Sequence, residues 1–134
     1  MTKAARAILP AAALLAVEVS CGGGASDLQK VRQDLVSWSG TLSIAAEQWG
    51  RGLDPTPYTR TVSTAAKDAL AKTSRTLARG SPPGDAAAAL RDAAQKLESH
   101  RQALDAAVAR RDGPAAVALA GELEALRRGL RSEP

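Results

Sequence analysis

Aromatic residues and cysteine are scarce in this chain of 134 residues, which has no phenylalanine, three aromatics, one histidine and one cysteine. A lone cysteine cannot form a disulfide within the chain, so its stability has to come from packing. A metal site in a helical bundle needs Glu-x-x-His on two helices, and covalent haem needs Cys-x-x-Cys-His. Neither pattern occurs, and no glycine-rich phosphate loop follows a strand pattern. We therefore expect no catalytic residue, metal or cofactor.

Long hydrophobic runs are also absent. The apolar run Ile8–Val17 has ten residues, whereas a membrane-spanning helix needs about 20. Lys3 and Arg6 precede this run, and small residues follow it. A positive start, an apolar centre and small residues at the end are typical of a signal peptide that is removed on export. The pattern therefore favours an export signal over a membrane-spanning helix.

The end of this segment, Ser20-Cys21 followed by Gly22–Gly24, resembles a bacterial lipoprotein signal. In that family the chain is cut before the cysteine, whose thiol carries the lipid. The resemblance implies that Cys21 is the first mature residue and the lipidation site, and two or more acyl chains give stable anchoring. The pattern departs from the family at Glu18, where an apolar residue is usual. The alternative is an ordinary secretory signal cut near Gly24, which leaves no anchor.

These features divide the chain into a signal peptide (1–20), a flexible tether (21–25) and a helical bundle domain (26–134). Two basic residues and one acidic residue leave with the signal, so 16 basic and 13 acidic residues remain. This excess is mild and is not typical of nucleic-acid binding. About 110 residues suffice for one domain with one hydrophobic core.

The mature part is rich in Ala and Leu, which favours helix over strand. The first predicted helix runs from about Ser26 to Gly50, and Ser26 with Gln29 forms a capping-box pattern. Gly40 is expected to be a weak point that costs about 1 kcal/mol relative to alanine. Apolar residues three and four apart form a seam along this helix. They are Leu28, Val31, Leu35, Trp38, Leu42, Ala45 and Trp49.

Three further helices are predicted between turn signals. They run over about 56–80, 85–111 and 116–130. Thr56 is expected to cap the second of them, with Pro57 at its first position. All connections are short, so the sequence predicts an all-α, up-down-up-down four-helix bundle. The rival is a pair of helical hairpins completed by a partner, since a heptad seam serves a homodimer equally well.

A few polar and aromatic residues receive individual predictions. Trp38 and Trp49 lie on the seam, so they are expected in the core rather than around a ligand. Tyr58 is expected at the rim, and His100 at the boundary of the third helix. Three serines are expected on the exposed side of the first helix. They are Ser37, Ser39 and Ser43.

Arginines gather near the predicted C-termini of the second and fourth helices, where they complement the helix dipole. If Cys21 is tethered, the second and fourth helices return toward the membrane. The arginines would then contact anionic head groups or a partner protein. This candidate contact site comprises Arg75, Arg79, Arg127, Arg128 and Arg131.

The sequence therefore predicts a lipid-anchored, non-enzymatic interaction module of the bacterial cell envelope, facing the periplasm or the exterior. Its expected partners are the membrane, through acylated Cys21, and another envelope protein or a second copy, but no nucleic acid. The alternative is a soluble exported protein that holds a small apolar ligand between its helices.

Overall fold

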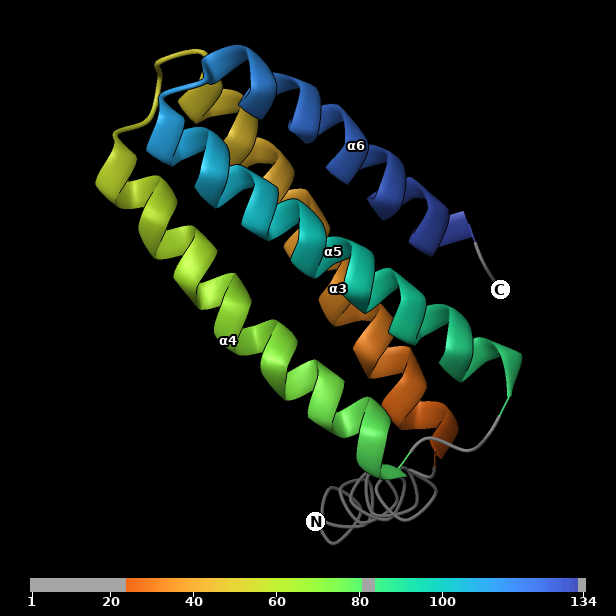
Figure 1. Cartoon of the computed structure of the whole chain (residues 1–134). Coiled ribbons are helices and arrows are strands. Elements are labelled where there is room, and N and C mark those ends of the chain that lie inside the picture. The colour runs from red at the N-terminus through yellow and green to blue at the C-terminus, as the bar shows by residue number, and fades with distance from the viewer. Residues whose placement is uncertain (1–23, 81–83, 133–134) are drawn as a thin grey trace, which may run out of the picture.

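The computed structural model describes residues 24–80 and 84–132, and these residues form four helices (Figure 1). The helices are α3 (Gly24–Gly50), α4 (Thr56–Gly80), α5 (Asp85–Arg110) and α6 (Gly113–Ser132). They alternate in direction along one bundle (Figure 1). The structure thus confirms the all-α, up-down-up-down four-helix bundle predicted from the sequence.

The four helices do not contact one another equally. α3 packs against all three others and most extensively against α6, whereas α4 and α6 do not contact each other. α3 and α5 therefore lie on the short diagonal of the bundle, and α4 and α6 lie on the long one. Because α3 packs against α6, the two hairpins close on each other within one chain.

The predicted apolar seam of the first helix does face the core. Val31, Leu35, Leu42 and Ala45 are buried, and Leu28, Trp38 and Trp49 are half-buried against the cluster. Leucine from all four helices and many alanines make up the buried cluster. Small alanine side chains let helices approach closely, and the leucines fill the space between them. Fully buried leucines are Leu35, Leu42, Leu90, Leu97, Leu104 and Leu123.

The helix starts differ from the predictions in three details. α3 begins at Gly24, so Ser26 lies inside it and Gly24 belongs to the helix rather than to the predicted tether. The Thr56 hydroxyl, expected to cap α4, instead accepts a hydrogen bond from the Trp49 indole N–H at 3.0 Å. α6 begins at Gly113, where the Asp112 carboxylate caps the helix by accepting the Ala115 amide at 3.1 Å.

Two helices end in the same type of turn. After α3, the Leu53 amide donates to the Gln48 carbonyl at 2.8 Å, and Gly52 adopts a positive φ of 77°. After α5, the Asp112 amide donates to the Ala107 carbonyl at 2.9 Å, and Arg111 takes the left-handed position with φ 54°. Glycine reaches this conformation without a steric penalty. The first turn is therefore relaxed, while the second keeps a side chain where glycine is usual.

The sequence prediction of exposure was wrong for two serines of α3, one of which lies in the interface between α3 and α6. Ser39 is fully buried, and its hydroxyl donates to the Leu35 carbonyl at 2.7 Å. Ser43 is part-buried and donates to the Ala120 carbonyl of α6 at 2.8 Å. Only Ser37 of the three is exposed. Serine satisfies its hydroxyl on a nearby carbonyl and is small enough for close helix packing, so its polarity did not indicate exposure.

Gly40 lies in the same interface. A Cβ atom on Gly40 would lie 3.2 Å from Cδ of Arg127 on α6. The absent side chain therefore gives the aliphatic stem of Arg127 room to pack. Gly40 has a packing role beyond the helix-propensity cost predicted for it.

Candidate functional site

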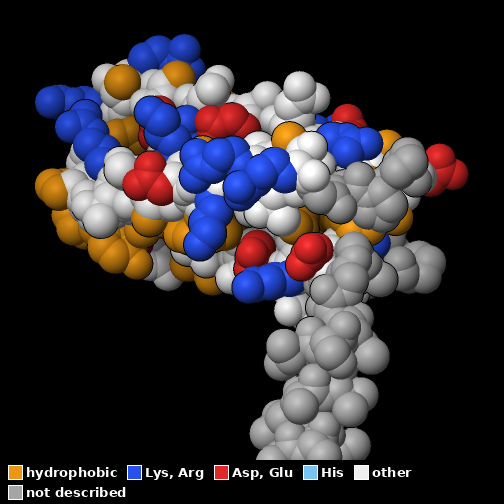
Figure 2. All heavy atoms as spheres, turned by 90° about the horizontal axis from the view of Figure 1, so that it is seen from below, with side chains coloured by type: hydrophobic (Ala, Val, Ile, Leu, Met, Phe, Trp, Pro, Cys, Tyr) orange, Lys and Arg blue, Asp and Glu red, His pale blue; other side chains and the backbone are white. Residues whose placement is uncertain are grey.

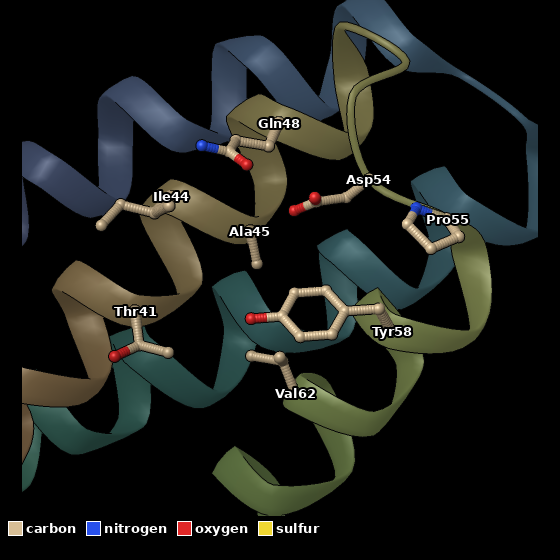
Figure 3. Close-up of a pocket in the computed structure, with 8 residues that line it drawn as sticks. All are labelled: Thr41, Ile44, Ala45, Gln48, Asp54, Pro55, Tyr58 and Val62. Atoms are coloured by element: carbon tan, nitrogen blue, oxygen red, sulfur yellow. The ribbon is translucent and has the colours of Figure 1, made fainter.

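An open groove of about 420 Å³ lies between α3 and α4, next to the turn that joins them (Figure 3). α3 contributes one wall, α4 contributes the other, and Asp54 and Pro55 come from the turn. The Schellman-type turn at Gly52 reverses the chain within a few residues and so brings the two walls together. The lining residues are Thr41, Ile44, Ala45, Gln48, Asp54, Pro55, Tyr58 and Val62.

Large hydrophobic side chains are exposed at this end of the bundle. Ile44 is 60% exposed, Leu53 67% and Tyr58 53%, and they are the exposed large hydrophobics of residues 24–80 and 84–132. Ile44 and Tyr58 line the groove, and Leu53 lies in the adjoining turn. Single exposed hydrophobics are ordinary, but their gathering around one concave site is typical of an interaction surface.

The groove also presents polar groups that are not used internally. Asp54 extends into the space between Gln48 and Tyr58 (Figure 3). Within the described part of the chain, these three side chains take part in no hydrogen bond or ion pair. Apolar surface combined with a few available polar groups can both bind and orient another molecule. The predicted rim position of Tyr58 agrees with its exposure.

A buried arginine, Arg101, joins α4 to α5. Its side chain is 6% exposed. Its guanidinium forms a bidentate ion pair with Glu98, in which Nε donates to Oε1 at 2.6 Å and Nη2 donates to Oε2 at 2.8 Å. Nη1 donates to Asp105 Oδ2 at 2.8 Å and to Ser63 Oγ at 3.2 Å. Ser63 in turn donates to Asp105 Oδ1 at 2.6 Å. The buried cation thus has hydrogen-bond partners on both helices.

The Arg101 network shifts the ionisation of its members. The hydrogen bonds from Arg101 lower the pKa of Glu98, and partial burial opposes this effect. The same pair raises the pKa of Arg101. This network was not predicted from the sequence, although the spacing of seven between Leu97 and Leu104 in the apolar stripe of α5 was a signal for it. Arg101 occupies the core position between them, with carboxylates three residues before and four after.

The residues singled out in the sequence lie apart from one another. Trp38 and Trp49 pack against the core but are half-buried, and His100 is half-buried on α5 as predicted for a boundary position. Trp38 borders a second open groove whose lining includes Asp27 and Lys72. Charged groups line the groove beside Trp38, so it differs from an apolar ligand pocket.

The five predicted arginines are placed on two helices that do not contact each other. Arg127 is half-buried and forms a bidentate ion pair with Glu124, one bond of which, Nε–Oε2, measures 2.8 Å. Hydrogen bonding to Arg127 lowers the pKa of Glu124. The other four are exposed, as Arg75 and Arg79 on α4 and as Arg128 and Arg131 on α6. Cys21 lies outside the described residues.

Within the described residues, no three His, Cys, Asp or Glu side chains are grouped so that they could hold a metal ion. None of the helices described combines the length and apolar character needed to cross a membrane. Comparison with protein-family models, curated proteins and solved structures gave no match to this chain.

Proposed function

We propose that this protein is an exported, lipid-anchored module of the bacterial cell envelope that has no enzymatic role. Its task is to hold a segment of another envelope protein in the groove between α3 and α4. The observation that carries the proposal is the gathering of Ile44, Leu53 and Tyr58 at that groove. A folded chain keeps such surface exposed at a cost in solubility, so it usually serves binding.

The signal pattern and the position of the groove support each other. α3 begins at Gly24, three residues after Cys21, and Ile44 lies 20 residues further along the helix. At 1.5 Å per residue this distance is about 30 Å. A lipid on Cys21 would therefore hold the start of α3 near the bilayer and the groove well away from it, within reach of a protein partner.

The chemistry of the groove restricts its occupant. Ile44, Tyr58 and Val62 provide an apolar surface, and Asp54 adds a carboxylate that forms no ion pair within the described residues. A protein segment with a large apolar side chain next to a lysine or arginine would satisfy both features. Apolar contact would supply affinity, and the Asp54 charge would orient the segment.

Replacing Cys21 by serine is expected to abolish both acylation and stable membrane attachment. A serine lacks the thiol that carries the lipid, and attachment requires two or more acyl chains. Mass measurement of the mature protein should show two or three acyl chains on the unaltered chain and none on Cys21→Ser. An unaltered protein that carries no lipid and begins elsewhere would overturn the anchor while leaving the groove open to test.

A photoreactive amino acid in place of Ile44 or Tyr58 is expected to crosslink one envelope protein in cells, through the same segment of that protein. The same amino acid in place of exposed Ala103 on α5 is the matched control and should give no such product. The mapped segment should contain a large apolar residue beside Lys or Arg, and Asp54→Lys should remove the product. Identical products at all three positions, or a segment without a basic residue, would contradict the proposal.

A further inference from the structure

Positive charge is distributed unevenly among the helices. α5 has four acidic and four basic residues, α3 has three acidic and two basic, and α6 has two acidic and three basic. α4 instead has five basic residues and a single acidic one, Asp68. The formal net charge of the chain is +4, so the excess of the described bundle resides mainly on α4. We call its five cations the basic face of α4: Arg60, Lys67, Lys72, Arg75 and Arg79.

All five cations of the basic face are exposed. The residues of α4 that face the core are different ones, and they recur at spacings of three and four. Lys72, Arg75 and Arg79 follow the same spacing and so share one side of the helix. None of the five is within 4.0 Å of a carboxylate in the described residues. Cations that neutralise no carboxylate of their own chain remain available to an external anion.

Two cations of the basic face, Lys67 and Lys72, lie near carboxylates of other helices. Lys67 contributes to the lowered pKa of Glu98, although the hydrogen bond from Arg101 is the larger cause. Lys72 shares a groove with Asp27 and Asp34 of α3, without an ion pair to either. Arg75 and Arg79 form no ion pair with a carboxylate of the described residues, and no acidic residue lies in the last two turns of α4.

The surface between these cations is small and polar. Apart from Tyr58, the exposed residues of α4 include no large hydrophobic side chain. Besides Asp68 and the five cations they are Pro57, Thr61, Thr64, Ala65, Ala71, Ser74 and Ala78. Figure 2 shows Lys and Arg side chains gathered across the underside of the bundle, where α4 lies. Protein interfaces usually depend on aromatic or large aliphatic anchors. This face lacks them, and it suits a plane of negative charge better than a shaped protein pocket.

We propose that the basic face of α4 binds the anionic head groups of a phospholipid bilayer through its last turns, which carry Lys72, Arg75 and Arg79. This inference rests on the proposed envelope location and deepens it. α4 ends at Gly80, on the end of the bundle at which α3 begins (Figure 1). A chain tethered just before Gly24 would therefore meet the bilayer with Arg75 and Arg79 first. Binding is electrostatic, because no apolar stripe of α4 is available for insertion.

The proposed contact differs from the head-group contact predicted from the sequence. Arg127 is occupied by Glu124, and α6 lies on the far side of the bundle from α4. Arg128 and Arg131 therefore do not extend the basic face of α4. Arg60, Lys67 and Lys72, which the sequence did not single out, belong to it.

The test compares binding of the full chain to vesicles of phosphatidylcholine with binding to vesicles containing phosphatidylglycerol. Every arm carries Cys21→Ser, so acylation contributes nothing and residues 1–23 are otherwise the same. The test variant is Lys72→Gln, Arg75→Gln and Arg79→Gln. The matched control, Arg110→Gln, Arg111→Gln and Arg128→Gln, removes the same charge from exposed positions on α5, its following turn and α6.

A basic residue near an anionic bilayer contributes roughly fivefold to partitioning, so the test variant should lose about a hundredfold of its preference for phosphatidylglycerol. The matched control should stay within a few fold, and 1 M salt should abolish the preference, because the Debye length then falls to about 3 Å. Arg75→Lys with Arg79→Lys should retain binding, which separates loss of charge from misfolding. If both triple variants lose this preference equally, net charge alone explains binding and the proposal is wrong. The proposal is also wrong if the protein with all five cations shows no preference for phosphatidylglycerol. Neither result bears on the proposed binding in the groove or on the proposed lipidation of Cys21, which have their own tests.

Discussion

Replacing Arg101 by alanine is expected to lower the free energy of unfolding by about 2–3 kcal/mol. The guanidinium is buried and joins Glu98 and Asp105 on α5 to Ser63 on α4. Its removal leaves the Glu98 and Asp105 carboxylates without their cation and opens a void. The loss should fall below the 3–5 kcal/mol typical of a fully buried pair, because the Glu98 and Asp105 side chains are 32% and 49% exposed.

A second variant, Arg101→Met, separates the loss of charge from the loss of packing volume. Methionine fills much of the same space without a charge, so the void is absent and only the polar contacts are lost. We expect a smaller loss than for alanine, about 1–2 kcal/mol, because the void is filled although the part-exposed Glu98 and Asp105 carboxylates still lose their cation. Urea unfolding followed by circular dichroism measures both variants. Equal losses for alanine and methionine would show that the charge, and not the packing, stabilises the α4–α5 contact.

The Arg101 contribution should also depend on pH. The pKa of Glu98 in the folded protein lies below its ordinary value of about 4.3. A depressed carboxylate pKa stabilises the fold fully above the unfolded value, and the contribution is lost as the pH falls through the folded value. The stability gap between the unaltered chain and Arg101→Ala should therefore be constant near neutral pH and narrow below about pH 4. A gap that does not change between pH 7 and pH 3 would contradict this assignment.

Gly50→Ala is expected to destabilise the bundle by about 2 kcal/mol, although alanine is the better helix former. A Cβ on Gly50 would lie 2.7 Å from the Gly113 carbonyl oxygen and 2.8 Å from Val117 Cγ2. The carbonyl belongs to the backbone and cannot rotate away as a side chain can. α3 and α6 would have to separate, and their interface is the most extensive in the bundle.

Gly121→Ala provides the matched control for this variant. Gly121 also lies within a helix, but a Cβ there would meet no atom within 4 Å. Alanine should therefore stabilise the protein by up to about 1 kcal/mol. Gly113→Ala should destabilise the bundle as Gly50→Ala does, since its Cβ would lie 2.7 Å from the Gly50 carbonyl oxygen. The double variant should lose less stability than the sum of the two single losses, because one separation of the helix ends makes room for both Cβ atoms. A neutral Gly50→Ala would show that the helix ends can separate freely.

How much of the bundle could be predicted differs from residue to residue. Leu35 and Leu42 were correctly assigned to the core because apolar side chains at heptad spacing can be buried only on one face. Ser39 and Ser43 were assigned wrongly, because a small hydroxyl can satisfy itself on a carbonyl in the interior. Arg101 was missed because its burial depends on Ser63, which comes from another helix and lies 38 residues away.

The sequence by itself determined the four helices of residues 24–80 and 84–132, their approximate limits and their alternating direction, because these depend on local periodicity, breakers and short connections. The predicted roles of Cys21 and of the export signal also come from the sequence, and they stay predictions. Only the tertiary structure decided which helices touch, since diagonal pairs depend on how side chains from distant segments fit. It joined Ile44 and Tyr58 in one groove, separated the two helices that carry the predicted arginines, and exposed all five cations of α4.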